Sequence, residues 1–105
     1  MSATYTENAK VFKAFCDENR LRILELLQDG DLCACVLIEK LGIKQPALSY
    51  HMKILVEAGI VQATSVGKWT HYHISETGCA NAEALLHHLT VMHTTATEVC
   101  DCERG

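Results

Sequence analysis

The stretch Gln45-Pro46-Ala47-Leu48-Ser49-Tyr50-His51-Met52-Lys53-Ile54-Leu55 decides the fold. Its apolar residues recur at helical spacing and predict one buried stripe, which consists of Leu48, Met52, Leu55 and Val56. Pro46 suits a first helical turn, and Gly59 suits the left-handed cap that ends a helix. We therefore expect an amphipathic helix that begins near Gln45.

The polar residues of this helix fall on its other faces and have the chemistry of DNA contacts. Gln45 and Ser49 can hydrogen-bond base edges in a major groove, Tyr50 offers a ring with a hydroxyl, and Lys53 can meet phosphate or guanine. An ordinary amphipathic helix with a solvated polar face explains these residues equally well by itself. The rest of the chain decides between the two interpretations.

The length of 105 residues fits one domain with a modest core. The net charge of −4 at first argues against DNA binding, but the charges are unevenly distributed. Between residues 44 and 73 the fully charged side chains are Lys44, Lys53 and Lys68 against Glu57 alone. A basic face on an acidic body fits moderate, salt-sensitive DNA affinity.

No apolar run approaches the ~20 residues of a membrane span, and residues 1–10 lack the apolar core of a signal peptide. We expect a cytoplasmic protein without a membrane partner. Six cysteines are numerous for such a protein. In a reducing compartment, clustered cysteines indicate metal ligands or redox thiols rather than a disulfide framework.

Helical patterns precede the decisive stretch and a strand pattern follows it. Helices are predicted over 6–16, over 20–28 with caps from residues 17–19, and over 31–40 with Asp31 as cap and Gly42 as stop. Together with 45–55, the third helix forms a helix-turn-helix. Alternation over 61–65 and 70–74 predicts a hairpin with Gly67 and Lys68 at its tip, the geometry of a wing.

A last helix is predicted over 79–99. Its apolar stripe has no evident partner in so small a domain, and it consists of Leu85, Leu89, Met92, Ala96 and Val99. A symmetric dimer, completed by the first helix, would cover the stripe and present two reading helices to an inverted-repeat operator. The alternative is a helix folded back onto its own core.

Nearly the whole chain resembles the ArsR/SmtB family of metal-sensing repressors. Three segments resemble the family: the entry to its second helix, Asp17-Glu18-Asn19-Arg20-Leu21-Arg22-Ile23-Leu24; its recognition helix, residues 45–55; and its wing, Gly67-Lys68 with Tyr72-His73-Ile74. A fourth segment resembles the cysteine box of the family's arsenic, cadmium and lead sensors, namely Asp31-Leu32-Cys33-Ala34-Cys35-Val36-Leu37. The chain departs from the family pattern at Glu18, Val36 and Lys44. The resemblance implies a mainly α, homodimeric winged helix-turn-helix of order ααααββα. Residues 1–105 would form one domain with dimerisation helices at both ends and a cysteine-containing tail over about 99–105.

Cys33 and Cys35 are predicted in the first turn of a helix, whose positive end favours the metal-binding thiolate. Residues two apart on a helix point to different sides, so both sulfurs can hold one ion only if the turn distorts. That distortion would disturb the neighbouring reading helix and release DNA. The alternative is two small buried residues.

Arsenite or antimonite is the expected inducer, with cadmium, lead or zinc as alternatives, and a trivalent arsenic centre requires three thiolates. Cys100 or Cys102 of the tail would complete the site, unless the tail is disordered and its thiols accidental. Cys16 is predicted to be core and Cys79 not to be a ligand. His87, His88 and His93 do not fit an interfacial zinc or nickel site.

The prediction is a repressor, not an enzyme, that binds double-stranded operator DNA as an apo homodimer and releases it when thiolates capture a soft ion. The predicted DNA contacts are Lys44, Gln45, Ala47, Ser49, Tyr50, His51, Lys53 and Lys68. The predicted metal ligands are Cys33, Cys35, Cys100 and Cys102. A thiol redox or persulfide switch on the same fold is a second hypothesis. A dithiol oxidoreductase or metal carrier is a third, and the absence of Cys-x-x-Cys argues against it.

Overall fold

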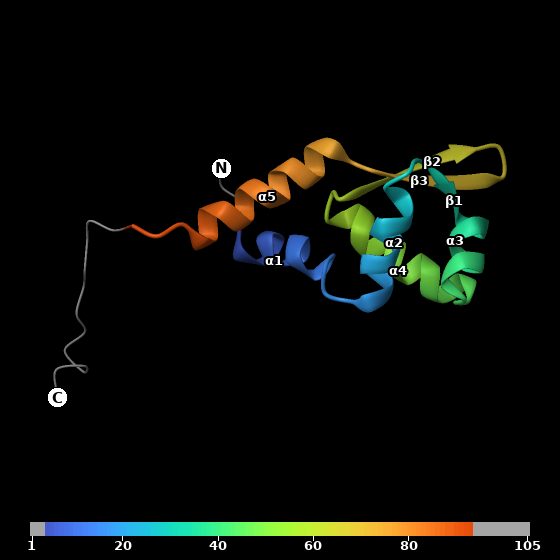
Figure 1. The fold of residues 1–105 in the computed structure, drawn as a ribbon, viewed down its shortest axis with the longest axis horizontal. Coiled ribbons are helices and arrows are strands. Elements are labelled where there is room, and N and C mark those ends of the chain that lie inside the picture. Colours follow the sequence, from blue (N-terminus) through green and yellow to red (C-terminus); the bar gives the residue numbers. More distant parts are fainter. Residues whose placement is uncertain (1–3, 94–105) are drawn as a thin grey trace, which may run out of the picture.

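The computed structural model describes residues 4–93, and within them helices surround a small antiparallel sheet (Figure 1). The elements are α1 (Tyr5–Lys13), α2 (Glu18–Leu27), β1 (Leu32–Cys33), α3 (Ala34–Leu41), α4 (Gln45–Glu57), β2 (Val61–Val66), β3 (Trp69–Ile74) and α5 (Glu76–Thr90). The winged helix-turn-helix prediction is confirmed, with one added strand between α2 and α3.

The core lies where α2, α3 and α4 meet the sheet. Its fully buried large side chains are Ile23, Leu37, Leu48, Met52, Leu55, Ile60 and Val61. The predicted stripe of α4 is therefore confirmed at Leu48, Met52 and Leu55. It is wrong at Val56, which is 38 % exposed, because His51 and Ile54 complete the inner face instead.

The first helix is shorter than predicted and contributes no buried residue of its own. Thr4 caps it by accepting a hydrogen bond from the Glu7 amide. It ends at Lys13, and the chain turns at Ala14, which is fully buried. Cys16 lies beyond that turn and is exposed, so its predicted core position is wrong.

α2 is capped by Asp17 as predicted, but α3 begins three residues later than expected. Leu32 and Cys33 form β1, which pairs antiparallel with β3 in the register Leu32↔Tyr72 and Cys33↔His71. Extended backbone at these two residues excludes a helix that starts at Asp31. Cys33 is instead the N-cap of α3 and makes no side-chain cap hydrogen bond.

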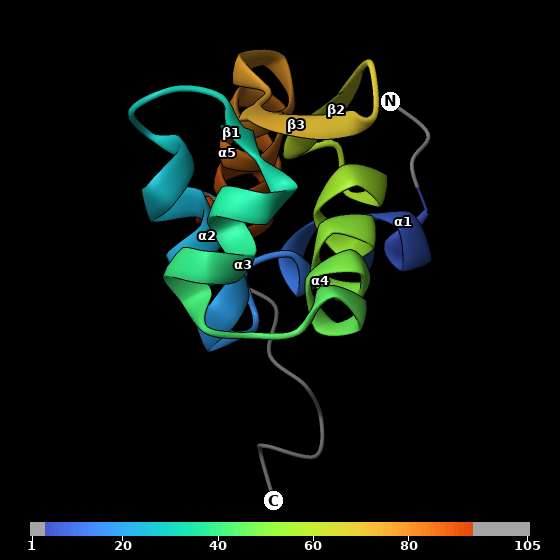
Figure 2. The same cartoon turned by 90° about the vertical axis from the view of Figure 1, so that its right-hand side faces the viewer.

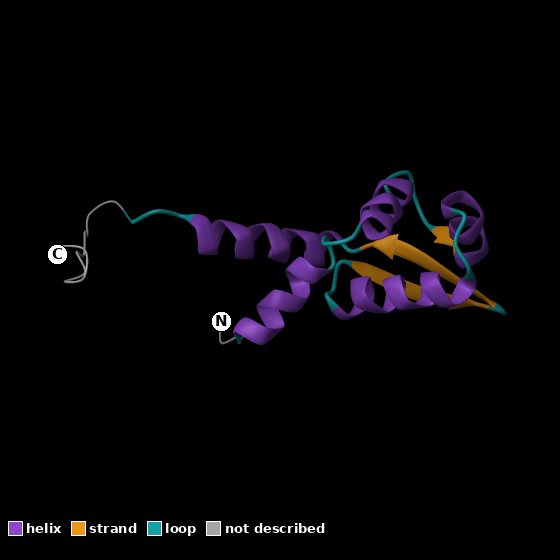
Figure 3. Cartoon of the chain, turned by 90° about the horizontal axis from the view of Figure 1, so that it is seen from below, coloured by secondary structure: helices purple, strands orange, loops and turns teal. Residues whose placement is uncertain are grey.

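The hairpin of β2 and β3 is the predicted wing, and β1 extends it into a sheet of order β1-β3-β2 (Figure 3). Val66 pairs with Trp69 at the tip. Gly67 has φ +63° there, a conformation that glycine adopts without strain. In Figure 2 the sheet crosses above α3 and α4.

α5 begins at Glu76, with the Ser75 hydroxyl as cap, and ends at Thr90, so the predicted range 79–99 is shifted. The predicted stripe residues Ala96 and Val99 lie outside the described residues. α5 runs beside α1 away from the sheet (Figure 1) and has no buried residue. Among the described residues, no helix is sufficiently long and apolar to cross a membrane.

Candidate DNA-binding surface and thiol pair

The outer face of α4 presents the polar side chains that the sequence places there. Gln45, Ser49 and Lys53 are exposed, and Tyr50 is 57 % exposed. Lys44 precedes the helix and is exposed too, whereas Ala47 is half-buried. An exposed face with amide, hydroxyl and ammonium groups has the chemistry to bind base edges and phosphates.

His51 differs from these residues because it is 8 % exposed and belongs to the inner side of α4. Its Nδ1 lies 2.9 Å from a guanidinium nitrogen of Arg20 on α2. The structure therefore sets His51 apart from the exposed residues that are predicted to contact DNA.

The wing adds a second exposed surface. Lys68 is exposed at its tip, and Val66 and Trp69 beside it are more than half exposed. His73 is held in the sheet by a 2.7 Å hydrogen bond between its Nε2 and Oε1 of Gln62. The tip is therefore more exposed than the half-buried histidines of β3.

The two thiols of the cysteine box lie together, with the Sγ of Cys33 2.8 Å from the Sγ of Cys35. The predicted separation of the two sulfurs is therefore wrong. Cys33 is the N-cap of α3 and has extended backbone, so it does not follow the helical rotation of about 100° per residue. Its side chain can therefore point to the same side as that of Cys35.

The two thiols of the pair differ in acidity. A hydrogen bond from the Cys35 thiol, with backbone amides of Cys35 and Val36, lowers the pKa of Cys33. The same thiol–thiol hydrogen bond, with burial and the charge of Cys33, raises the pKa of Cys35. Cys33 is therefore the first to become thiolate, the form that binds soft ions.

The thiol pair is connected both to the helix-turn-helix, through α3, and to the wing, through β1. α3 leads through Gly42 and two further residues into α4, and Cys33 is the direct sheet partner of His71 in the wing. The sequence did not reveal the second connection. A two-residue strand has too few positions for an alternating pattern.

The remaining Cys and His residues do not complete a metal centre in the described part of the chain. Within residues 4–93, no three His, Cys, Asp or Glu side chains are arranged to hold an ion. Cys79 is half-buried, and burial, together with Glu83, raises its pKa. His87, His88 and His93 are exposed. Cys100 and Cys102 lie outside the described residues.

Comparisons with known proteins bear on what this arrangement does. Residues 17–63 match the pattern described as "bacterial regulatory protein, arsR family". The "arsenical resistance operon repressor" of Staphylococcus aureus is 34 % identical over 100 residues, which cover 95 % of this chain and 92 % of that protein. The chain belongs to the arsR family.

Two further relatives agree with this membership. An uncharacterised helix-turn-helix transcriptional regulator of Methanocaldococcus jannaschii is 46 % identical over 67 % of this chain and 80 % of its own. The solved structure of an ArsR-like transcriptional regulator from Rhodococcus is 29 % identical, with TM-score 0.72 over 81 % of this chain and 78 % of that one. This arsR family member is a transcriptional repressor with a DNA-binding winged helix; its family consists of regulators, not enzymes.

Proposed function

We propose that this arsR family member represses an arsenic-responsive operon and leaves its operator when arsenite or antimonite binds to thiolates. Relatives in Staphylococcus aureus, Bacillus subtilis and Escherichia coli are named arsenical resistance operon repressors. The observation that carries the proposal is the thiol pair: two sulfurs 2.8 Å apart, one with a lowered pKa.

Cys33 and Cys35 supply two ligands in this proposal. Trivalent arsenic requires a third thiolate, and we assign it to Cys100 or Cys102 of the tail. Cys16 and Cys79 are poorer candidates. Cys16 lies on the α1–α2 turn, and Cys79 is the residue of α5 whose sulfur lies 3.9 Å from the Ile60 carbonyl oxygen.

The mechanism follows from the space that an ion needs. Two thiolates about 2.3 Å from a tetrahedral ion such as zinc lie about 3.8 Å apart. The Cys33 and Cys35 sulfurs, now at 2.8 Å, must separate to admit it. An ion held by both sulfurs and by a third thiolate would fix the start of α3 relative to the end of β1, and this constraint would act on α4 and the wing. Such couplings typically change affinity by about 5- to 150-fold.

The partner is double-stranded operator DNA with an inverted repeat. We assign base and phosphate contacts to the exposed residues of α4 and the wing, namely Lys44, Gln45, Ala47, Ser49, Tyr50, Lys53 and Lys68. The whole of residues 1–105 acts as one domain in this proposal, with the end helices serving dimerisation.

A second copy of the chain is the proposed occupant of the face formed by α1 and α5. Neither helix has a buried residue in the single chain, and their large apolar side chains Tyr5, Leu86 and Leu89 are 88 %, 52 % and 49 % exposed. A groove lined by Tyr5, Asn8, Asn81, Ala84, Leu85, His88 and Leu89 runs between the two helices. A two-fold axis through this face covers the apolar surface in both copies at once.

A thiol redox or persulfide switch is the second candidate, and the same distance favours it. Sulfurs 2.8 Å apart need only a small movement to form a disulfide, and the lowered pKa of Cys33 favours its oxidation. Cadmium, lead or zinc in the same thiol site is a variant of the first candidate.

The deciding experiment measures binding to an operator duplex against graded arsenite, antimonite, cadmium, lead and zinc, and separately against peroxide and persulfide. The proposal is supported if stoichiometric arsenite releases the operator DNA from the wild type, and if this release is abolished in Cys33→Ala and weakened in Cys102→Ala. Cys16→Ala serves as the matched control. Normal release from Cys33→Ala would contradict the inducer site, and release by oxidants alone would favour the second candidate.

A further inference from the structure

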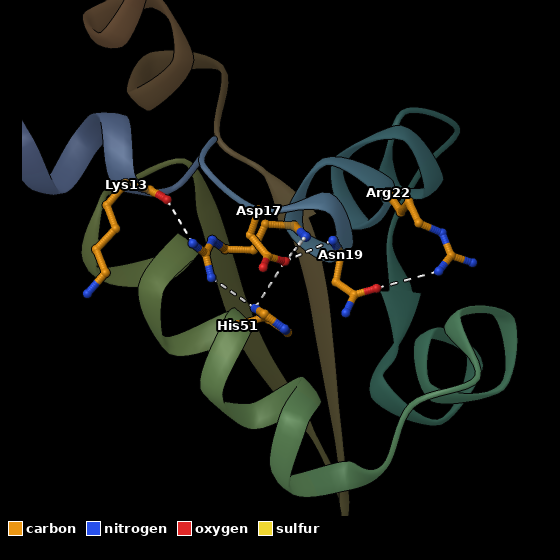
Figure 4. A network of polar contacts seen from close by, with 6 residues as sticks. Lys13, Asp17, Asn19, Arg22 and His51 are labelled. Carbon is orange, nitrogen blue, oxygen red and sulfur yellow. Dashed lines mark hydrogen bonds and ion pairs between the residues drawn. The ribbon is translucent and has the colours of Figure 1, made fainter.

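A buried polar network connects three helices behind the DNA-binding face (Figure 4). Arg20 of α2 is only 5 % exposed. One of its terminal nitrogens lies 2.9 Å from Nδ1 of His51 in α4, and the other donates to the Lys13 carbonyl at 3.0 Å. One side chain thus joins the C-terminal end of α1, the first turn of α2 and the middle of the recognition helix.

The direction of the central hydrogen bond follows from the chemistry of its two groups. A guanidinium carries only donors and does not lose its proton in proteins. Nδ1 of His51 must therefore be the acceptor, and the ring proton must sit on Nε2. A doubly protonated imidazole has no acceptor and repels the guanidinium. The contact exists only with neutral His51.

The groups around the ring make this contact difficult to replace. The Nε of Arg20 is buried and has no hydrogen-bond partner among the described residues. Loss of His51 would leave a second guanidinium donor buried without a partner, which is more costly than losing an exposed hydrogen bond. The position of α4 against α1 and α2 is thus tied to one acceptor atom.

Asp17 offers the ring a competing partner. Its Oδ2 accepts from the backbone amides of Asn19 and Arg20 and lies 3.7 Å from Nδ1 of His51. A protonated His51 would turn its Nδ1 proton toward this carboxylate and give up Arg20. The only group of α1 in this network is the Lys13 carbonyl, which accepts from Arg20. Among the described residues of α3 and β2, no charged group lies within ion-pair distance of the His51 ring.

We propose that Arg20 and His51 are positioning residues for DNA binding: their hydrogen bond holds the recognition helix at the orientation in which its outer face fits the major groove. His51 does so from the buried side of α4, and its ring contacts the exposed Tyr50 edge-on, with the ring centroids 5.3 Å apart. The proposal depends on the DNA-binding function of the family and is independent of the inducer.

The test uses the full chain and an inverted-repeat duplex selected by the wild-type protein from a random pool. His51→Leu removes the acceptor, whereas His51→Asn places an amide oxygen near the position of Nδ1 and cannot be protonated. We expect His51→Leu to weaken binding by about tenfold or more, the loss typical of a hydrogen bond to a charged group. His51→Asn should bind like the wild type, and Arg20→Met should bind like His51→Leu.

The pH profile separates positioning from general stability. Wild-type affinity should fall as the pH drops from about 8 to about 5, where histidine gains its charge. His51→Asn, which has no titratable group at this position, should lose that fall. Equal affinities of His51→Leu and the wild type, or an unchanged pH profile in His51→Asn, would overturn the proposal.

A measurement on the wild type alone covers the case in which His51→Leu fails to fold. Nitrogen-15 chemical shifts of the imidazole report which ring nitrogen carries the proton. The proposal requires the Nε2–H form of His51 with Nδ1 unprotonated at neutral pH. A ring with its proton on Nδ1 is incompatible with it.

Discussion

Cys33 stands directly opposite His71 in the sheet, so one of the two sulfurs proposed to bind the inducer is fixed to the strand that builds the wing. Cys35 lies on the other side of the junction, inside α3. An ion that moves these two sulfurs apart therefore acts between a helix and a sheet. In the proposed mechanism, the wing and the helix-turn-helix are both connected to the point where the ion acts.

This relationship predicts an optical signal from the wing. The chain has a single tryptophan, Trp69, which lies on β3 two residues before His71 and is 58 % exposed. Stoichiometric arsenite should change its fluorescence. The change should disappear in Cys33→Ala and persist in Cys16→Ala, whose thiol is remote from the wing. An unaltered spectrum at saturating arsenite would show that β1 does not transmit the strain.

The unequal thiols predict selective alkylation. Because the Cys35 thiol lowers the pKa of Cys33, Cys33 should react with iodoacetamide at lower pH than Cys35 does. Cys35→Ala removes the donor, so the rate profile of Cys33 should move to higher pH. Mass spectrometry of quenched samples measures both rates, with Cys16 as internal reference. Equal profiles of Cys33 and Cys35 would contradict the assignment.

The close packing of Gly78 on α5 against Gly59, just after α4, predicts that stability is sensitive to a larger residue at position 78. A Cβ at this position would overlap the backbone carbonyl of Gly59. Gly78→Ala should therefore destabilise the fold by about 1–3 kcal/mol, the usual cost of overpacking. Urea denaturation measures the loss, and Thr77→Ala, at an exposed position of the same turn, is the matched control. Comparable stability of the two variants would refute the close packing.

Asp17 predicts how stability responds to acid. Burial raises its pKa, but hydrogen bonds from the Arg20 and Asn19 amides and the nearby His51 and Arg20 outweigh this and leave the pKa below 3.8. A carboxyl whose pKa is lower in the folded state stabilises the fold above pH 3.8, and this contribution disappears as the pH falls through the folded-state value. Asp17→Asn should flatten that decline in urea titrations, whereas Asp29→Asn should not.

The outer face of α4 predicts two different kinds of DNA defect. Lys53→Ala should weaken binding to all sequences and reduce the salt slope by about one unit, because it removes the proposed phosphate contact. Gln45→Ala should mainly relax sequence preference. Fluorescence anisotropy at several salt concentrations distinguishes them, with Lys10→Ala on α1 as the charge-matched control. A salt slope that Lys53→Ala leaves unchanged would exclude the phosphate contact.

The periodic elements were predictable from the sequence because burial imposes their pattern. α4 and the hairpin repeat their apolar residues at the spacing of a helix and of strands, and the structure places them accordingly. The end of α5 was not predictable in this way, because the stripe continues through Met92 while the helix stops at Thr90. Thr90 and Val91 are β-branched, and such residues weaken a helix without interrupting its apolar pattern.

Two parts of the candidate site depend on contacts that the sequence does not encode locally. β1 exists because β3 supplies its backbone partners, about forty residues further along the chain. Arg20 and His51 are 31 residues apart and meet only after α2 and α4 have packed. The sequence placed His51 among the groove-facing residues because its chemistry suits DNA, and only tertiary packing reveals that it points inward.

The start of α3 carries a thiol where most helices carry a hydroxyl or carboxylate. A serine at this position would give the first amides of α3 a stronger acceptor than the neutral thiol, and such a cap commonly adds about 1 kcal/mol. The usual serine replacement of Cys33 would thus both delete a proposed ligand and tighten the turn at which the inducer is proposed to act. Amide hydrogen exchange in this turn should therefore be faster in the native chain than in the serine variant, and in the proposed mechanism a weakly capped turn opens more easily.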